Sequence, residues 1–307
     1  MRTVDGISRL LTKMDLEKKS IERIKMASEM SLHHYGTPLV CTYSGGKDSD
    51  VMLELFKRSG VPFEVVNSHT TVDAPPTVKH IREVFAELEI QGINCEIDYH
   101  TQPNGSRITM WNLIPGKLMP PTRLVRYCCS VLKETYGKGR FIATGVRWDE
   151  SSKRMEWGSI SAPSIRLHAT DEIMLMNDND TKRKLIEQCA MKGKMVVNPI
   201  IDWTHRDVWD YIHSEHIATN ILYECGYDRV GCIGCPMASK HRWKEFADFP
   251  TYKTAYILSF DKMVEERKRR GKNTVWKSGK EAFLWWMEDK NIEGQMNLFE
   301  DGFVREN

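Results

Sequence analysis

The chain has 307 residues, of which 41% are hydrophobic and 28% charged, and its net charge is +2 at pH 7. This length can bury a full core, and the composition is that of an ordinary globular protein. No apolar run is long enough for a membrane helix and no signal-peptide core begins the chain, so we expect a cytoplasmic protein without membrane association. Eight cysteines in a cytoplasmic chain do not indicate a disulfide framework.

Strand and helix patterns alternate along the first two thirds of the chain. An amphipathic helix is predicted over residues 15–35, and helical patterns also begin at 51, 76 and 204. Strands are predicted over residues 39–42, 63–67, 93–99, 141–144 and 196–200. The alternation predicts an α/β fold with a parallel twisted sheet flanked by helices, followed by a helical C-terminal extension. We expect three segments: 1–36, 37–238 and 239–307.

A glycine loop connects the first strand to the next helix. Its residues are Ser44, Gly45, Gly46, Lys47, Asp48 and Ser49. The two glycines let backbone N–H groups converge on an anion in front of a helix N-terminus, and Lys47 adds a positive charge. Asp48 suits Mg²⁺ or a helix cap, and the serines can donate to phosphate oxygens. The loop departs from the Walker pattern, and its alternative interpretation is a plain turn.

Two further polar segments follow strands of the predicted sheet, at the edge where ligands bind. The loop over residues 68–77 contains Thr70 and Asp73, and the loop over 145–154 contains Gly145, Arg147, Glu150 and Arg154. Residues 100–126 are expected to be irregular because they contain four prolines. A solvated turn is the alternative for the 145–154 loop.

Four of the cysteines form two close pairs, Cys128-Cys129 and Cys232-x-x-Cys235. Four thiolates suit zinc and an iron–sulfur cluster equally by count. Adjacent cysteines are awkward for structural zinc, so a cluster is favoured. The alternative is a buried Cys128-Cys129 pair, with only the second turn binding a metal.

The C-terminal region contains a basic stretch over residues 267–272 and tryptophans at 276, 285 and 286. Basic and aromatic residues together can bind single-stranded nucleic acid. The alternative is a solvated helix end with inward-packed tryptophans, which we favour for the tryptophans.

These motifs together resemble the phosphoadenosine phosphosulfate reductase family of the adenine nucleotide alpha-hydrolase-like fold. Residues 44–49 resemble its PP-loop, and Gly145-Val146-Arg147-x-x-Glu150-Ser151-x-x-Arg154 resembles its arginine-containing segment. The block from Pro199 to Trp209 and the cysteine turn from Leu222 to Pro236 also match. The resemblance covers about residues 39–236 and leaves the helical remainder uncovered.

The resemblance implies a 4Fe–4S cluster on Cys128, Cys129, Cys232 and Cys235, as in adenylyl-sulfate reductases and DNA phosphorothioation proteins of the DndC type. It also implies an adenine nucleotide on the PP-loop, with Lys47 and Arg147 at the phosphates. The chain departs from the sulfonucleotide reductases of the family in two ways. Its PP-loop is intact, and no cysteine follows Cys235, since its Glu-Cys-Gly motif at residues 224–226 precedes the cluster turn.

We therefore expect an ATP pyrophosphatase that cleaves ATP between the α and β phosphates, with Mg²⁺, to activate an acceptor for sulfur transfer. Lys47, Asp48 and Arg147 are the expected catalytic residues. A nucleic acid is one candidate acceptor, and a sulfur donor or partner protein is implied. The alternatives are a sulfonucleotide reductase that uses Cys225 to form sulfite, and a nucleic-acid-binding subunit gated by nucleotide.

Overall fold

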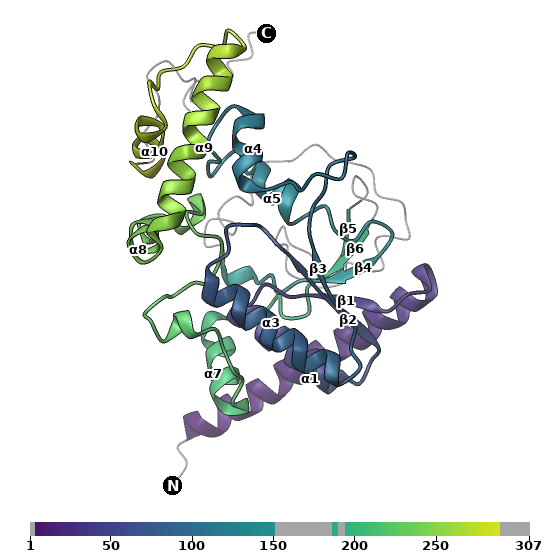
Figure 1. Ribbon diagram of the computed structural model, residues 1–307. Helices are drawn as coiled ribbons and strands as arrows, with labels where there is room; N and C mark the ends of the chain where they lie inside the picture. The colour runs from purple at the N-terminus through teal and green to yellow at the C-terminus, as the bar shows by residue number, and fades with distance from the viewer. Residues whose placement is uncertain (1–3, 151–185, 190–193, 289–307) are drawn as a thin grey trace, which may run out of the picture. The chain divides into compact units, whose positions relative to one another are not determined.

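The computed structural model describes residues 4–150, 186–189 and 194–288 (Figure 1). By compactness the chain divides into two units. The first unit comprises Met1–Thr101 and Ser130–Cys232, and the second comprises Gln102–Cys129 and Ile233–Asn307. Residues 102–129 thus fold with the C-terminal helices, and the predicted segment boundaries stay a prediction. Within the described ranges, no helix is both long and apolar enough to cross a membrane.

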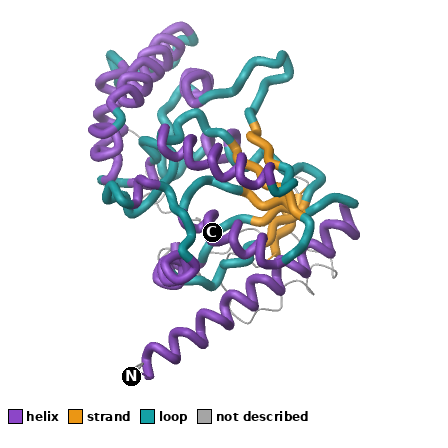
Figure 2. Tube along the Cα trace, turned by 60° about the horizontal axis from the view of Figure 1, so that its bottom comes forward, coloured by secondary structure: helices purple, strands orange, loops and turns teal. Residues whose placement is uncertain are grey.

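The first unit is built on one sheet, which has six strands among the described residues (Figure 2). The strand order is β3-β2-β1-β4-β6-β5. The five strands from β3 to β6 in this order run parallel to one another, and β5 pairs antiparallel with β6 at the edge. The strands are β1 Leu39–Thr42, β2 Phe63–Ser68, β3 Cys95–Asp98, β4 Phe141–Ala143, β5 Ile186–Cys189 and β6 Lys194–Val197. The parallel sheet is confirmed, and β5 is a strand that the polar sequence around it concealed.

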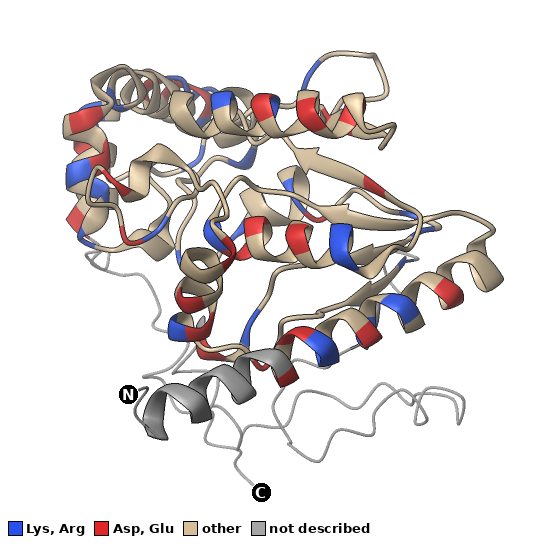
Figure 3. Cartoon of the chain, turned by 90° about the horizontal axis from the view of Figure 1, so that it is seen from below, with Lys and Arg blue, Asp and Glu red and all other residues tan. Residues whose placement is uncertain are grey.

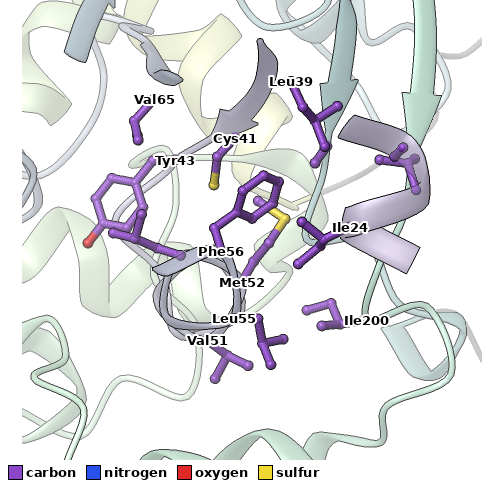
Figure 4. Packing of buried hydrophobic residues seen from close by; sticks show 14 of the residues in the cluster. Ile24, Leu39, Cys41, Tyr43, Val51, Met52, Leu55, Phe56, Val65 and Ile200 are labelled. Atoms are coloured by element: carbon purple, nitrogen blue, oxygen red, sulfur yellow. The ribbon is translucent and has the colours of Figure 1, made fainter. Parts of the chain in front are cut away.

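Four helices of the first unit contribute side chains to one core cluster on a face of the sheet. They are α1 Val4–Tyr35, α2 Lys47–Ser59, α3 Pro75–Ile90 and α7 His205–Glu215. Strand residues alternate between faces, so Leu39 and Cys41 join this cluster with Phe56 of α2 (Figure 4). Val40 and Ile142 belong to a separate, smaller cluster. α7 begins where the sequence predicts a helical pattern, with Thr204 as its N-cap, because the Thr204 side chain accepts from the Asp207 N–H.

The helix α1 is tied to the segment after β6 by an ion pair as well as by apolar packing. Arg23 donates to both carboxylate oxygens of Asp202, at 2.6 and 2.9 Å, and also to the Pro199 carbonyl. Lys19 donates to the same carboxylate at 2.6 Å. Elsewhere along the described part of α1, acidic and basic residues are interleaved (Figure 3). That pattern is typical of a helix with one solvated face.

The second unit contains four helices of eight or more residues among the described residues. They are α4 Met110–Lys117, α8 His241–Asp248, α9 Pro250–Arg269 and α10 Gly279–Glu288. The prediction that residues 100–126 are irregular is wrong for α4. Thr109 and Asn112 form a reciprocal cap, and the helix tolerates Pro115 in its interior. Trp276 and Trp286 are buried, so the inward-packed interpretation of these two is confirmed.

Replacing Phe56 by alanine tests the main core. Phe56 is fully buried, and its ring lies 5.2 Å from that of Phe63. We expect Phe56→Ala to lower the free energy of unfolding by about 3–5 kcal/mol, through lost burial and the cavity left behind. Ile90→Ala is the control, because Ile90 is 87% exposed. Denaturant titration measures both, and equal losses would contradict this description of the core.

The Arg23–Asp202 pair predicts a pH-dependent contribution to stability. Burial alone raises the pKa of Asp202, but hydrogen bonds from Arg23 and Lys19 outweigh it, and the net pKa is lowered. A carboxyl with a lowered folded pKa stabilises the protein above its unfolded pKa of about 3.9, and this contribution is lost as the pH falls through the folded value. We expect Asp202→Asn to cost about 1.5–3 kcal/mol at pH 7, as for a hydrogen bond to a charged group. The difference from wild type should close in acid. A difference that stays constant between neutral and acidic pH would refute this role.

Candidate functional site

The strand order places a topological switch point between β1 and β4. From β1 the chain proceeds through α2 to β2 and then to β3, and it returns to β4 on the opposite side of β1. In open parallel sheets, ligands bind outside the carboxyl ends of the strands at such a point. The glycine loop leaves the end of β1, and the loop with Gly145 and Arg147 leaves the end of β4. The fold therefore brings these two predicted segments together.

Gly45 turns the glycine loop in a conformation that other residues adopt only with strain. Its φ is +72°, and a Cβ at this position would lie 2.8 Å from Cγ1 of Ile81 in α3. Its carbonyl accepts a hydrogen bond of 3.2 Å from the side chain of Asn220. Asn220 is fully buried and also donates to the Thr77 hydroxyl at 3.0 Å. The glycine loop is thus held in place by packing against α3 and by the hydrogen bond from Asn220.

The N-terminus of α2 is capped from within the loop. The Ser49 hydroxyl accepts from the Gly46 N–H at 3.1 Å and donates to the Gly46 carbonyl at 2.7 Å. The Ser44 hydroxyl donates to that of Ser49 at 3.3 Å. The Lys47 N–H donates to the Tyr223 hydroxyl at 2.9 Å. The Tyr223 hydroxyl oxygen therefore accepts a hydrogen bond from one N–H of the helix N-terminus. An anion would be favoured at the same position.

Asp48 links the two cations of the site. It lies 3.0 Å from Nζ of Lys47 and 2.7 Å from Nε of Arg147. Both cationic side chains are buried, whereas the carboxylate of Asp48 is partly exposed. Asp149 lies 3.5 Å from Arg147, and its side chain is 44% exposed. Three residues predicted to be catalytic, Lys47, Asp48 and Arg147, therefore form one contiguous ionic group.

Gly145 allows the β4 loop to approach the glycine loop closely. A Cβ on Gly145 would lie 3.3 Å from the backbone carbon and oxygen of Asp48. The loop continues into a short 3₁₀ helix, Trp148–Glu150, and the backbone of Glu150 ends it. The Glu150 side chain and all of Arg154 lie outside the described residues, so their predicted roles stay predictions.

The other predicted loop is organised by Asp73. Its carboxylate accepts from the Thr70 N–H at 3.1 Å and from the Thr70 hydroxyl at 2.8 Å. Thr71, between them, has a φ of +67°, which is rare for a β-branched residue. Asp73 also forms an isolated antiparallel bridge with Cys232, whose sulfur lies 3.4 Å from the Thr70 hydroxyl. The Thr70–Asp73 loop therefore contacts one of the predicted cluster ligands.

A buried polar network behind the glycine loop was missed in the sequence. The Tyr43 hydroxyl donates to Asp50 at 2.5 Å, and Nε2 of His80 lies 2.9 Å from that hydroxyl. Burial raises the pKa of Asp50, more than its hydrogen bonds to His80 and Tyr43 lower it. The network joins the end of β1 to α2 and α3. An acidic residue inside the apolar face of a helix was the available signal.

The cysteines are divided by the unit boundaries. Cys128 and Cys129 lie in α5 (Tyr127–Leu132), and Cys235 precedes a 3₁₀ helix, Pro236–Ala238; all three belong to the second unit. Cys232 is the last residue of the first unit. Within the described ranges, no group of three or more potential ligands is gathered tightly enough to hold a metal ion.

One guanidinium lies among the thiols of the second unit. Nη2 of Arg126 is 3.3 Å from the sulfur of Cys129. Burial lowers the pKa of Arg126, but this hydrogen bond and the charges of Cys129, Cys235 and Cys128 raise it overall. Three of the predicted ligands therefore act on the same cation.

The basic stretch of the second unit is partly engaged within the protein. Arg267 donates to the carbonyls of Leu118 and Asn273. Arg269 and Arg270 both pair with Glu266, whose pKa their hydrogen bonds lower to about 2. These contacts reduce the charge available to a phosphate backbone. A nucleic-acid partner therefore stays a prediction.

Comparison with known proteins assigns most of the chain to one family domain. Residues 38–238 match the model of the phosphoadenosine phosphosulfate reductase domain. This match covers more than half of the chain. The chain belongs to that family.

Individual relatives of the family domain are distant. An uncharacterised protein of Methanocaldococcus jannaschii is 26% identical over 264 residues, which cover 83% of this chain and 54% of that protein. The adenosine 5'-phosphosulfate reductase of Geobacillus kaustophilus is 26% identical over 66% of this chain and 74% of its own length. The phosphoadenylyl-sulfate reductase structure from Candida auris, in a phosphate complex, has 17% identity and a TM-score of 0.44, and covers 72% of this chain and 93% of that one.

The chain spans only part of its first relatives. It covers about half of the first Methanocaldococcus jannaschii protein and 36% of a second uncharacterised protein from that organism.

Substitutions at two glycines of the family domain separate the cost of backbone strain from the cost of steric crowding. Gly45 and Gly60 have φ values of +72° and +69°, but nothing lies within 4 Å of a Cβ built on Gly60. Gly60→Ala should therefore cost only the left-handed conformation, about 1–2 kcal/mol. Gly45→Ala adds overpacking against Ile81 and should cost about 1–3 kcal/mol more. Denaturant titration measures the difference, and equal costs would show that α3 does not hold the loop.

Proposed function

We propose that the family domain binds ATP and cleaves it between the α and β phosphates. The observation that carries this proposal is the ionic group at the switch point, in which Asp48 holds the buried cations Lys47 and Arg147 beside the N-terminus of α2. Two cations and a helix N-terminus at one place are suited to a polyphosphate. The pyrophosphate part of ATP is assigned to residues 44–49.

The ionic group also explains how the site stays stable before nucleotide binds. Two buried cations without a counter-ion would be costly, and Asp48 offsets that cost in the absence of ligand. When a nucleotide arrives, phosphate oxygens replace Asp48 as the partners of Lys47 and Arg147. The carboxylate of Asp48 is then available for Mg²⁺, which prefers oxygen ligands. The Lys47 N–H exchanges the Tyr223 hydroxyl for a phosphate oxygen in the same step.

The reaction is an adenylyl transfer. An acceptor oxygen attacks the α-phosphorus, the bond from this phosphorus to the α–β bridging oxygen breaks, and pyrophosphate leaves with the electron pair. Lys47, Arg147 and the amides of the loop stabilise the negative charge that grows on the departing pyrophosphate. Mg²⁺, when bound, neutralises part of that charge. Gly145 keeps Arg147 close to Asp48 and thus within the site.

The cysteines are assigned to a 4Fe–4S cluster on Cys128, Cys129, Cys232 and Cys235. Thiolates are the usual ligands of such a cluster, and one of these four, Cys129, lies 3.3 Å from the guanidinium of Arg126. The donor chemistry therefore fits. The bound cluster would supply a redox-active or sulfur-coordinating centre. Sulfur from the donor then attacks the acceptor atom that bears the adenylylated oxygen, the bond from that atom to the oxygen breaks, and AMP leaves with the oxygen and the electron pair. We propose a sulfur donor or partner protein as the source of the sulfur, and a nucleic acid as candidate acceptor.

Pyrophosphate release tests the ATP reaction. We expect wild-type protein with ATP and Mg²⁺ to release pyrophosphate, and Lys47→Ala to release at least about a hundredfold less, as for the loss of one preorganised charge-stabilising group. Lys57→Ala is the matched control, because Lys57 lies exposed at the other end of α2. No release by wild type, with acceptor-containing cell extract supplied, would contradict the proposal. So would equal release by the Lys47 and Lys57 variants.

A sulfonucleotide reductase is the second candidate, and one observation favours it. The thiol of Cys225 is exposed and follows Tyr223 by two residues, and the Tyr223 hydroxyl contacts the Lys47 amide. A nucleophile therefore lies two residues along the chain from a side chain that contacts the glycine loop. Sulfite formation from adenylyl sulfate with thioredoxin, abolished in Cys225→Ser, would establish this reaction in place of ATP cleavage.

A further inference from the structure

We propose that the C-terminal helices, which lie beyond the family domain, shape the second cysteine turn for ligand binding, with Glu245 and Tyr256 as positioning residues. The family match ends at residue 238, whereas α8 begins at His241. The inference rests on the cluster assignment of the proposed function. The contacts that carry it lie within the second unit, which begins at Ile233, the residue after Cys232.

The backbone between the two cysteines of the turn is bound from α8 and α9. The Gly234 N–H donates to Oε2 of Glu245 at 2.7 Å. The Tyr256 hydroxyl donates to the Ile233 carbonyl at 3.0 Å. Both side chains are buried, at 8% and 1% exposure, so each bond is formed away from solvent. The two residues that separate Cys232 from Cys235 therefore have their backbone direction set by the C-terminal helices.

The rings of Phe246, Tyr256 and Trp286, which we call the aromatic floor, leave room for glycine alone at the centre of the turn. Gly234 has a φ of +72°, and a Cβ there would lie 2.6 Å from Phe246 and 2.9 Å from Trp286. It would also lie 3.2 Å from the ring of Tyr256. These three rings are mutually packed, with centroids 4.9–6.1 Å apart. The turn thus lies against a rigid surface, and its shape is fixed by packing as well as by hydrogen bonds.

The same aromatic floor holds the segment that carries the other cysteine pair. Nε1 of Trp286 donates to the Pro121 carbonyl at 2.6 Å. Arg123, three residues before Arg126, donates to the Pro236 carbonyl next to Cys235. Residues 102–129 and the turn are therefore anchored to common partners within this unit.

A buried carboxylate at Glu245 has a cost that ordinary packing does not require. Desolvating a carboxylate is unfavourable unless it accepts strong hydrogen bonds, and an apolar residue would fill the same space without that cost. The hydrogen bond from the Gly234 N–H to the Glu245 carboxylate fixes both the position and the direction of the turn. Groups that orient metal ligands in this way commonly change metal affinity by about 10–100-fold when removed.

The experiment measures how fast the protein loses its cluster, and it does not depend on enzymatic turnover. Wild type and variants are reconstituted anaerobically with iron and sulfide, and the absorbance near about 400 nm is followed after addition of a chelator, well below the melting temperature. We expect Glu245→Ala and Tyr256→Phe to lose the cluster about tenfold faster than wild type. Glu245→Gln retains an acceptor oxygen and should behave like wild type. Glu265→Gln on α9 is the exposed control.

A reference variant separates positioning from general stability. Met263 is fully buried in α9, so Met263→Ala lowers the melting temperature of the unit without removing a bond to the turn. If Met263→Ala speeds cluster loss as much as Glu245→Ala, the proposal is overturned. Wild-type rates in Glu245→Ala and Tyr256→Phe, or no iron–sulfur uptake by wild type, would overturn it too. Pyrophosphate release is measured on the same samples, so a failure of ATP cleavage is recognised separately.

Discussion

The constraint on which the site depends is the neutralisation of two buried cations by Asp48. Lys47 comes from the start of α2 and Arg147 from the loop after β4, and both contact Asp48 because β1 and β4 are neighbours. Each cation would be costly to bury alone, and their approach requires a close contact that Gly145 permits. The contact of Asp48 with Lys47 and Arg147 thus depends on the parallel sheet, on the switch point and on the glycine positions. The nucleotide chemistry proposed for the protein is an exchange of partners within that contact.

Much of the first unit could be predicted because local and global signals agree there. The strand at residues 39–42, the capped start of α7 at Thr204 and the parallel sheet follow from periodicity and cap chemistry that the tertiary structure does not override. The proximity of the glycine loop to Arg147 follows from the rule that ligands lie at the carboxyl ends of parallel strands. The helix α4 was missed, since Pro115 in its interior is a local signal against helix. The polar sequence around β5 likewise concealed an edge strand that depends on pairing with β6.

Interactions between distant segments were the least predictable part of the site. Nothing local shows that Tyr223 reaches the Lys47 amide, or that Asn220 holds the Gly45 carbonyl across 175 residues. The partnership of Asp50 with Tyr43 and His80 requires knowledge of which helix face is buried. The C-terminal helices were expected as an extension with a basic surface. Their buried side instead binds the cysteine turn through Glu245 and Tyr256, and several of the arginines on their surface are paired internally.

In the proposed reaction, residues 44–49 hold the pyrophosphate part of ATP. Calorimetric titration with inorganic pyrophosphate and Mg²⁺ tests it most directly, because it needs neither the acceptor nor the sulfur donor. We expect pyrophosphate to bind one site per chain, to compete with ATP and to fail to bind when Lys47 is replaced by alanine. Absence of pyrophosphate binding, together with tight binding of adenylyl sulfate, would contradict it.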